Sequence, residues 1–177
     1  MNFNFKKKFS SLIAQRFFME SCFEELKVTK PGNLSKNSAI FGMNIKFFYR
    51  AAELSAPIIC KKNELGEKIF SASQSCLIEL KSNYNLGILL LCTPILEVAI
   101  NGFEDISDFK KKLNKLLWNI SNDEGKKIFN AIKISKPGGI KNYNGKFDIK
   151  NISFNSNFKE GMLMASEWDR IARSYVD

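Results

Sequence analysis

The chain has 177 residues, of which 45% are hydrophobic and 25% charged, with a net charge of +9 and no histidine. This length and composition are typical of one folded domain with a substantial core and exclude a disordered chain. The lack of histidine excludes Ser-His and Cys-His nucleophile systems and histidine metal sites, so acid-base chemistry falls to carboxylates, lysines or tyrosines.

The basic charge does not predict nucleic-acid binding, because the lysines are spread along the chain and no zinc-finger or RNA-recognition spacing accompanies them. A general affinity for phosphorylated ligands fits this charge better. The four cysteines form no Cys-x-x-Cys pair, so we expect buried thiols at Cys22, Cys60, Cys76 and Cys92 rather than zinc ligands or disulfides.

The N-terminal lysines do not introduce a secretory signal, because Gln15, Arg16 and Glu20 interrupt the apolar stretch that follows. The apolar run at 87–100 is shorter than the roughly 20 residues that span a bilayer. We therefore expect a cytoplasmic protein without membrane contact.

The first half of the chain predicts four helices. The first begins at Ser10 or Ser11, reaches about Val28 and ends before a Lys-Pro-Gly-Asn stretch at 30–33. Asn44 caps the second, which Pro57 kinks or extends, and Asn63 opens the third, which ends near Ser82. The predicted buried stripe of the first helix consists of Leu12, Met19, Cys22, Phe23 and Leu26.

The fourth helix follows a polar turn, Asn-Tyr-Asn-Leu-Gly at 83–87, which leads directly into the most apolar run of the chain. This order places amide side chains and free backbone donors at the N-terminal end of a helix that must be buried. We interpret the turn as functional and the helix as structural.

The second half predicts a fifth helix capped by Ser107-Asp108, a sixth from Asn122 or Asp123 to a Lys-Pro-Gly-Gly stop at 136–139, and a long functional loop over 140–157. The spacing of Met162, Ala165, Trp168, Ala172 and Tyr175 predicts one final helix from Phe158 to the end. Since nothing alternates with period two, the predicted class is all-α, a multi-helix orthogonal bundle with residues 1–177 as a single helical domain.

Several loop and helix motifs together resemble the triphosphoribosyl-dephospho-CoA synthase family, ATP:dephospho-CoA triphosphoribosyl transferase. The resemblance extends from about residue 20 to the C-terminus. The motifs, in chain order, are Glu25-Leu26 with Lys30-Pro31-Gly32-Asn33; Gly42-Met43; Leu65-Gly66-Glu67-Lys68-Ile69; Asn83-x-Asn85-Leu86-Gly87-Ile88; Ala131-Ile132 with Pro137-Gly138-Gly139; and Glu167-x-Asp169-x-Ile171-Ala172-Arg173-x-Tyr175.

The resemblance implies a helical enzyme that joins ATP to 3'-dephospho-CoA, with release of adenine, to make a prosthetic-group precursor for citrate lyase and malonate decarboxylase. The 2'-hydroxyl of dephospho-CoA displaces adenine at the anomeric carbon of ATP's ribose, so the reaction is glycosyl transfer. It also implies Mg²⁺ bound with ATP.

This chemistry suggests roles for residues of the motifs. A carboxylate near the anomeric carbon would stabilise oxocarbenium character, and another would take the hydroxyl proton; the candidates are Glu25 and Asp169, with Glu167 behind them. No metal ligand is assigned. The candidate substrate-binding residues are Lys30, Gly32, Asn33, Asn83, Asn85, Gly87, Gly138, Gly139 and Arg173.

Each assignment has a structural alternative. Lys30-Pro31-Gly32 is also a helix stop, Asn83 and Asn85 are also caps, and Asp169 with Arg173 is also a surface ion pair. We expect Trp168 and Tyr175 to lie in the core.

The function also has alternatives, namely a non-catalytic nucleotide-binding module or a helical interaction protein derived from this family. Better-known members carry a histidine near Gly42-Met43 and a Thr-His after the asparagine turn, so the resemblance is to a divergent branch. Family members usually continue beyond the position of Asp177. The chain is thus either sufficient as it stands or the first portion of a longer domain, and a homodimer is open.

Overall fold

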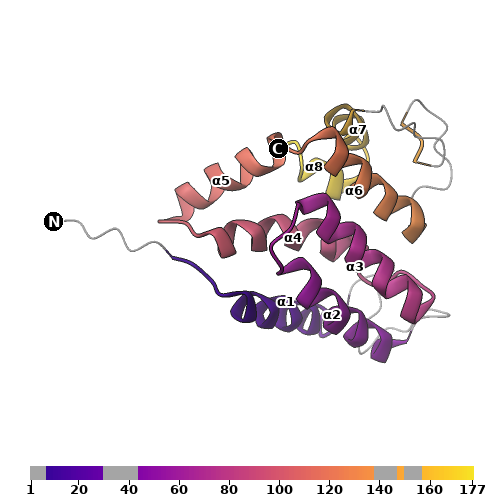
Figure 1. The fold of residues 1–177 in the computed structure, drawn as a ribbon. Coiled ribbons are helices and arrows are strands. Elements are labelled where there is room, and N and C mark those ends of the chain that lie inside the picture. The colour runs from indigo at the N-terminus through magenta and orange to yellow at the C-terminus, as the bar shows by residue number, and fades with distance from the viewer. Residues whose placement is uncertain (1–6, 30–43, 138–146, 150–156) are drawn as a thin grey trace.

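The computed structural model describes residues 7–29, 44–137, 147–149 and 157–177 (Figure 1). Within these residues the chain forms eight helices, and the only β pairing is an isolated bridge between Lys7 and Phe103. The predicted all-α class is therefore confirmed. The helices are α1 Ser11–Glu25, α2 Ile45–Ile59, α3 Leu65–Leu80, α4 Leu86–Asn101, α5 Ile106–Trp118, α6 Asn122–Ser135, α7 Phe158–Ala165 and α8 Arg170–Arg173.

The helix starts follow capping chemistry. Ser10 and Asn44 cap α1 and α2 as predicted, each accepting a backbone N–H of the first turn. The predicted starts of α3 and α5 were wrong by one to three residues, whereas Asn122 begins α6 as predicted. Glu64 precedes α3, Asp105 caps α5 through the Asp108 N–H at 2.8 Å, and Ser121 caps α6.

Helix α4 lies between two hydrophobic cores. The first core joins α4 to α1, α2 and α3 around Phe18, Ile59 and Leu89. The second joins α4 and α3 to α6, α7 and α8 around Ile69 and Ile128. In Figure 1, α4 accordingly passes between α1 and α2 at the bottom and α6 to α8 at the top. Its predicted burial is confirmed, because it supplies side chains to both cores.

The predicted buried stripe of α1 was partly wrong. Leu12 is 77% exposed, whereas Ala14, Phe18 and Cys22 face the core. Apolar residues surround this helix, with Phe17 and Phe18 adjacent, so the sequence does not determine which face is covered. Of the four predicted buried thiols, Cys92 is only partly buried.

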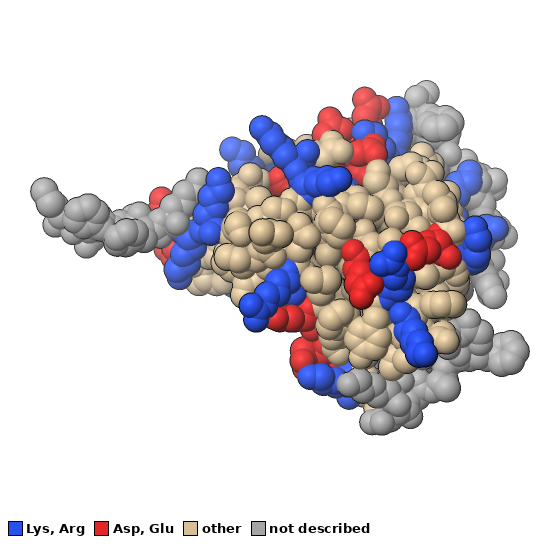
Figure 2. All heavy atoms as spheres, turned by 60° about the horizontal axis from the view of Figure 1, so that its bottom comes forward, with Lys and Arg blue, Asp and Glu red and all other residues tan. Residues whose placement is uncertain are grey.

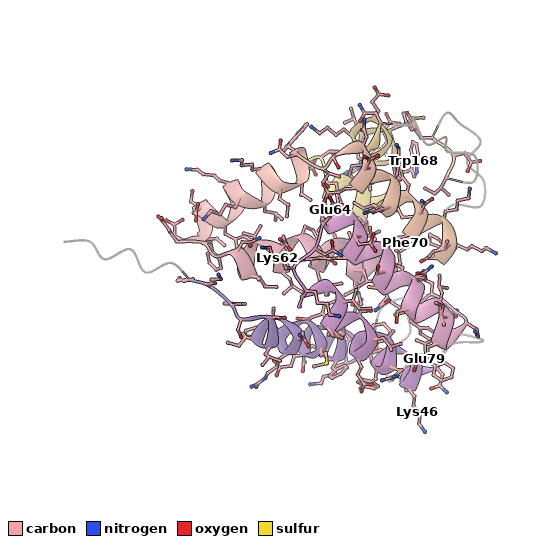
Figure 3. The ribbon with its side chains drawn as sticks, in the orientation of Figure 1. Lys46, Lys62, Glu64, Phe70, Glu79 and Trp168 are labelled. Atoms are coloured by element: carbon pink, nitrogen blue, oxygen red, sulfur yellow. The ribbon has the colours of Figure 1, made fainter. Side chains whose placement is uncertain are left out.

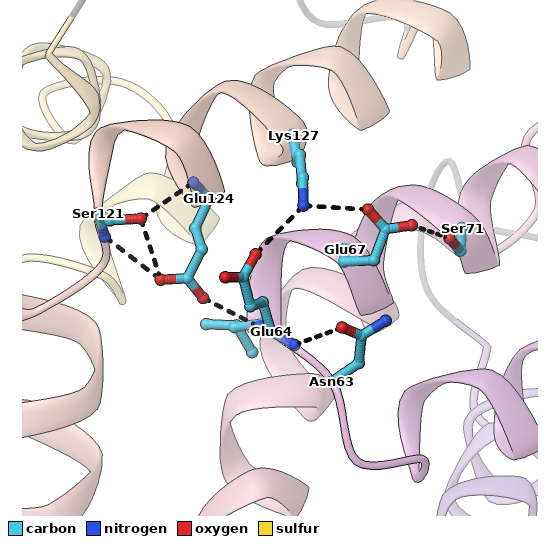
Figure 4. Close-up of polar contacts among 8 residues, drawn as sticks. Asn63, Glu64, Glu67, Ser71, Ser121, Glu124 and Lys127 are labelled. Atoms are coloured by element: carbon cyan, nitrogen blue, oxygen red, sulfur yellow. Dashed lines mark hydrogen bonds and ion pairs between the residues drawn. The ribbon is translucent and has the colours of Figure 1, made fainter.

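The motif at 65–69 acts in packing. A Cβ at Gly66 would lie 2.3 Å from the carbonyl oxygen of Glu124, so only glycine allows α3 and α6 to approach this closely. Figure 4 shows the polar contacts around this crossing: the Glu124 carboxylate accepts the Leu65 N–H at 3.0 Å, and Lys127 bridges Glu64 and Glu67. The Glu124 contact satisfies one N-terminal donor of α3, which has no side-chain cap of its own.

Two neighbouring side chains stabilise the ionised form of the Glu67 carboxyl. Hydrogen bonds from Ser71 and then from Lys127 lower the pKa of the Glu67 carboxyl below its ordinary value. The same contacts raise the pKa of Lys127, chiefly through Glu67 and then Glu64. The cluster therefore favours the ionised forms of Glu67 and Lys127.

A second ion pair links α3 to α4 inside the molecule. The Lys68 side chain is only 2% exposed and its Nζ donates to a carboxylate oxygen of Glu97, which is 21% exposed. Asn101 donates to the other oxygen of Glu97 at 2.8 Å. Sequence reasoning missed this pair. Lysines are almost never buried unless they are paired, and a single sequence does not show which carboxylate pairs with Lys68.

Charges on the surface are mixed. On the face shown in Figure 2, basic and acidic side chains lie next to one another rather than in separate fields. Exposed pairs such as Arg50 with Glu79 and Arg16 with Glu20 are of the kind that contributes little to stability. None of the helices in the described ranges combines the length and apolar character needed to cross a bilayer.

Candidate functional site

A pocket of about 250 Å³ opens where α4 begins, α6 ends and α7 turns into α8. Its wall comes from segments far apart in the sequence. They are the turn before α4 with the first turns of that helix, the C-terminal half of α6 with Pro137, the short segment 147–149, and the stretch 161–172. Three of the sequence motifs thus meet at one place.

Most of the pocket wall is apolar. Leu86 and Leu90 reach it from α4, Ile132 from α6, and Phe147 and Ile149 from the segment that follows. Leu86 and Leu90 belong to the second core, so the pocket is an opening in a packed region rather than a surface groove. Such a wall suits a flat organic ring better than a solvated ion.

The connection between α7 and α8 carries the charged group of the pocket. The sequence predicted one final helix, but the chain breaks at 166–169, because the Asp169 carboxylate caps a new helix by accepting the Ala172 N–H at 2.7 Å. Asp169 and Trp168 both line the pocket. Trp168 is 55% exposed, so the prediction that it lies in the core was wrong, whereas Tyr175 is buried as expected.

Arg173 secures this connection. Its guanidinium donates to the Ser166 carbonyl from Nε at 3.1 Å and from a terminal nitrogen at 2.9 Å. These bonds tie α8 back onto the end of α7 and so fix the turn that holds Asp169. The predicted role of Arg173 at phosphate stays a prediction.

The two asparagines of the turn before α4 lie in different surroundings, one at the pocket and the other in the core. Asn83 lines the pocket with Gly87, and its Oδ1 accepts the Leu86 N–H at 3.0 Å. Asn85 is 4% exposed and donates to the Ala51 carbonyl at 3.2 Å and to Ser55 Oγ at 2.9 Å. Asn85 thus joins α4 to α2 and points away from the pocket.

The structure does not bring Glu25 to this pocket. Glu25, the last residue of α1, is not among the lining residues of the pocket, and its carboxylate instead adds to the rise in the pKa of the Cys92 thiol that burial chiefly causes. Cys92 packs against the first core, on the side of α4 that faces α1, whereas the pocket uses the second core. Glu167 is exposed and is not a lining residue, although Trp168, which follows it, lines the pocket.

Five predicted residues lie outside the described residues: Lys30, Gly32, Asn33, Gly138 and Gly139. Pro137, which directly precedes the two glycines, lines the pocket. Most of the predicted loop at 140–157 also falls outside the described ranges.

Sequence reasoning missed most of the apolar wall. Phe129, Phe147 and Gly161 line the pocket, and a Cβ at Gly161 would lie 2.8 Å from the Phe129 ring. Gly161 therefore lets α7 approach α6 closely. The only sequence signal for this wall was Trp168 in the C-terminal motif, and its spacing instead suggested the buried face of a helix.

The fold and pocket define an all-helical protein with a mostly apolar pocket at the helix ends of its bundle. Residues 12–177 match the family model CitG, ATP:dephospho-CoA triphosphoribosyl transferase, and the chain therefore belongs to that family. The predicted family is confirmed. The chain is a transferase for triphosphoribosyl transfer from ATP to dephospho-CoA, in the synthesis of the citrate lyase prosthetic group. Comparisons with curated proteins and with solved structures give no match.

Proposed function

We propose that the triphosphoribosyl transfer takes place at the pocket between α4, α6, α7 and α8. The observation that supports this is the convergence of three motif segments, represented by Asn83, Pro137 and Asp169, on one opening. These residues are up to 86 positions apart (169 minus 83). Packing alone does not require three motifs to share one cavity.

Asp169 is the carboxylate that we place at the reacting carbon. Cleavage of the bond between adenine and ribose leaves positive charge on the sugar, which a nearby carboxylate stabilises. The Asp169 Oδ1 is held by the Ala172 N–H, and Oδ2 remains to face the sugar or to accept the proton of the acceptor hydroxyl. Glu167, which adjoins the pocket-lining Trp168, remains the candidate for a second carboxylate.

The triphosphate requires positive charge, which the described wall of the pocket does not supply. Lys30, with Gly32, Asn33, Gly138 and Gly139, remains our prediction for this part of the site. The exposed Arg173 lies next to the pocket and is a further candidate.

Mg²⁺ is the expected partner of the triphosphate, whose charge it would neutralise. The described residues contain no group of three His, Cys, Asp or Glu side chains that could hold a metal. Magnesium usually takes only one or two protein carboxylates and keeps its remaining bonds for phosphates and water. The substrates are intracellular metabolites, so we expect a cytoplasmic enzyme.

The test is adenine release by the purified chain from ATP and Mg²⁺, with dephospho-CoA as acceptor. CoA, which carries the additional 3'-phosphate, serves as the control acceptor. We expect adenine and triphosphoribosyl-dephospho-CoA to form in equal amounts, and only with dephospho-CoA. ATP binding without any adenine release would instead indicate the non-catalytic nucleotide-binding module.

A further inference from the structure

Resting on the proposed function, we infer that the pocket holds the adenine that departs from ATP, that the Asn83 amide donates a hydrogen bond to it, and that the triphosphate lies outside the pocket. This divides the substrate between two places. It also changes our expectation for Asn83 and Gly87, which the sequence suggested as triphosphate ligands.

The charge of the wall argues against phosphate. Among the described lining residues there is no lysine or arginine, and the one charged side chain is Asp169. A triphosphate in this opening would lose its hydration against leucine, isoleucine and phenylalanine and would meet a negative carboxylate. An uncharged purine loses little hydration there and gains contact with Phe147 and Trp168.

The polar group at the other side of the pocket suits a departing base. Asn83 Oδ1 is engaged by the Leu86 N–H, which leaves Nδ2 as a donor at the pocket wall. Gly87 lies in the first turn of α4, a helix of 16 residues, where the backbone dipole favours negative charge. The Asn83 donor and the N-terminal end of the α4 dipole both stabilise an adenine ring that is gaining negative charge.

This distinguishes the adenine of ATP from the adenine of dephospho-CoA. In the transfer, the bond between the anomeric carbon and N9 breaks and its electron pair stays on the adenine. The acceptor oxygen bonds to that carbon and gives its proton to Asp169; the adenine takes up one proton from solvent, and Asp169 returns its proton to solvent. Only the adenine of ATP gains negative charge, so only this base benefits from Asn83 and the start of α4.

The two tryptophans of the chain provide a matched pair of reporters. Trp168 lines the pocket and is 55% exposed, whereas Trp118 at the end of α5 is 54% exposed and packs beneath Lys159. Figure 3 shows Trp168 beside α6 and the end of α7. Trp118→Phe leaves Trp168 as the only indole, and Trp168→Phe leaves Trp118.

We would titrate both variants with adenine and, separately, with inorganic tripolyphosphate and Mg²⁺, and record tryptophan fluorescence. Adenine should change the signal of Trp118→Phe saturably and leave Trp168→Phe unchanged, and tripolyphosphate should not displace it. In kinetics of the wild type, adenine should compete with ATP and not with dephospho-CoA. Displacement of adenine by tripolyphosphate, or competition with dephospho-CoA alone, would overturn the inference.

The role of Asn83 is tested by Asn83→Asp, which keeps an oxygen for the Leu86 N–H and removes the donor. Its control is Asn44→Asp, the same change at the cap of α2, which lies outside the described pocket wall. Figure 3 shows Lys46, whose N–H this cap accepts, well away from Trp168. We expect kcat to fall about 10- to 100-fold in Asn83→Asp and to stay unchanged in Asn44→Asp. Equal kcat in both would remove Asn83 from the inference.

These outcomes separate the inference from the proposed function. A chain that releases adenine but shows no response of Trp168 to adenine retains the function and loses the adenine assignment. A chain in which adenine quenches Trp168 but ATP is never cleaved retains the assignment and loses the function.

Discussion

Substitution of Asp169 separates its two roles, as helix cap and as pocket carboxylate. In Asp169→Asn the amide oxygen still accepts the Ala172 N–H, which lies 2.7 Å from the carboxylate, and Asn and Asp are equally good caps. We expect the free energy of unfolding to change by less than about 0.5 kcal/mol. Asp169→Ala loses the bond and about 1 kcal/mol, which lowers Tm by about 2–4 °C in a chain of this size.

Both substitutions remove the negative charge from the pocket. If the carboxylate stabilises the sugar cation or accepts the hydroxyl proton, adenine release should fall about 10²- to 10⁴-fold in each variant. The measurement is kcat for adenine release with saturating ATP and dephospho-CoA, together with thermal unfolding of the same preparations. Rate and stability should therefore separate in Asp169→Asn and fall together in Asp169→Ala.

Asp105 supplies the matched control, because it caps α5 through the Asp108 N–H at 2.8 Å and lies outside the pocket wall. Asp105→Ala should lose about 1 kcal/mol and keep its rate, and Asp105→Asn should change neither. If Asp169→Asn retains kcat within about threefold of wild type, general acid-base catalysis at this residue is refuted. Asp169 is then a helix cap only.

Three further predictions concern the packing around α3. Gly66→Ala should destabilise the chain by at least about 1–3 kcal/mol in urea unfolding, because its Cβ would lie 2.3 Å from the Glu124 oxygen; unchanged stability would contradict the close crossing. Lys68→Met should cost about 3–5 kcal/mol by leaving the Glu97 carboxylate without its cation, and Lys68→Met with Glu97→Leu should recover most of it; additive losses would argue against a coupled pair. The depressed pKa of Glu67 stabilises the fold at neutral pH, and this stability is lost as pH falls below the ordinary value of 4.5; Tm of wild type should therefore drop more steeply there than Tm of Glu67→Gln, and parallel curves would contradict it.

The parts of the fold that sequence predicted are those set by local chemistry. The start of α4 was predictable, because a polar turn is followed by an uninterrupted apolar run, and so were the caps at Ser10 and Asn44. The break before α8 was not. The spacing of Met162, Ala165 and Ala172 continues across it, and the competing cap of Asp169 becomes visible only when the bond to Ala172 forms.

The buried pair of Lys68 and Glu97 shows a different limit. Lys68 falls between Leu65 and Ile69 on the apolar stripe of α3, and Glu97 lies on the most apolar helix, so each charge was visible where an apolar residue was expected. The partner of such a charge cannot be identified from a single sequence. The pairing depends on how α3 crosses α4, which is a property of the tertiary structure.

The family motifs divide into two physical kinds, and this bears on how the chain departs from better-known members. Gly66 and Lys68 serve the packing of α3, while Asn83 and Asp169, each at a helix start, face the pocket. Helix starts retain free donors, so ligand contacts concentrate there.

The departure after the asparagine turn falls on residues 84–86. Tyr84 is 7% exposed and Asn85 is 4% exposed, and Asn85 bonds to α2, so two of these three positions serve the core and only Leu86 reaches the pocket. Asn83 and Gly87, on either side, keep their places in the pocket wall. A change at this turn therefore alters how α4 packs against α2 more than what the pocket presents to a ligand.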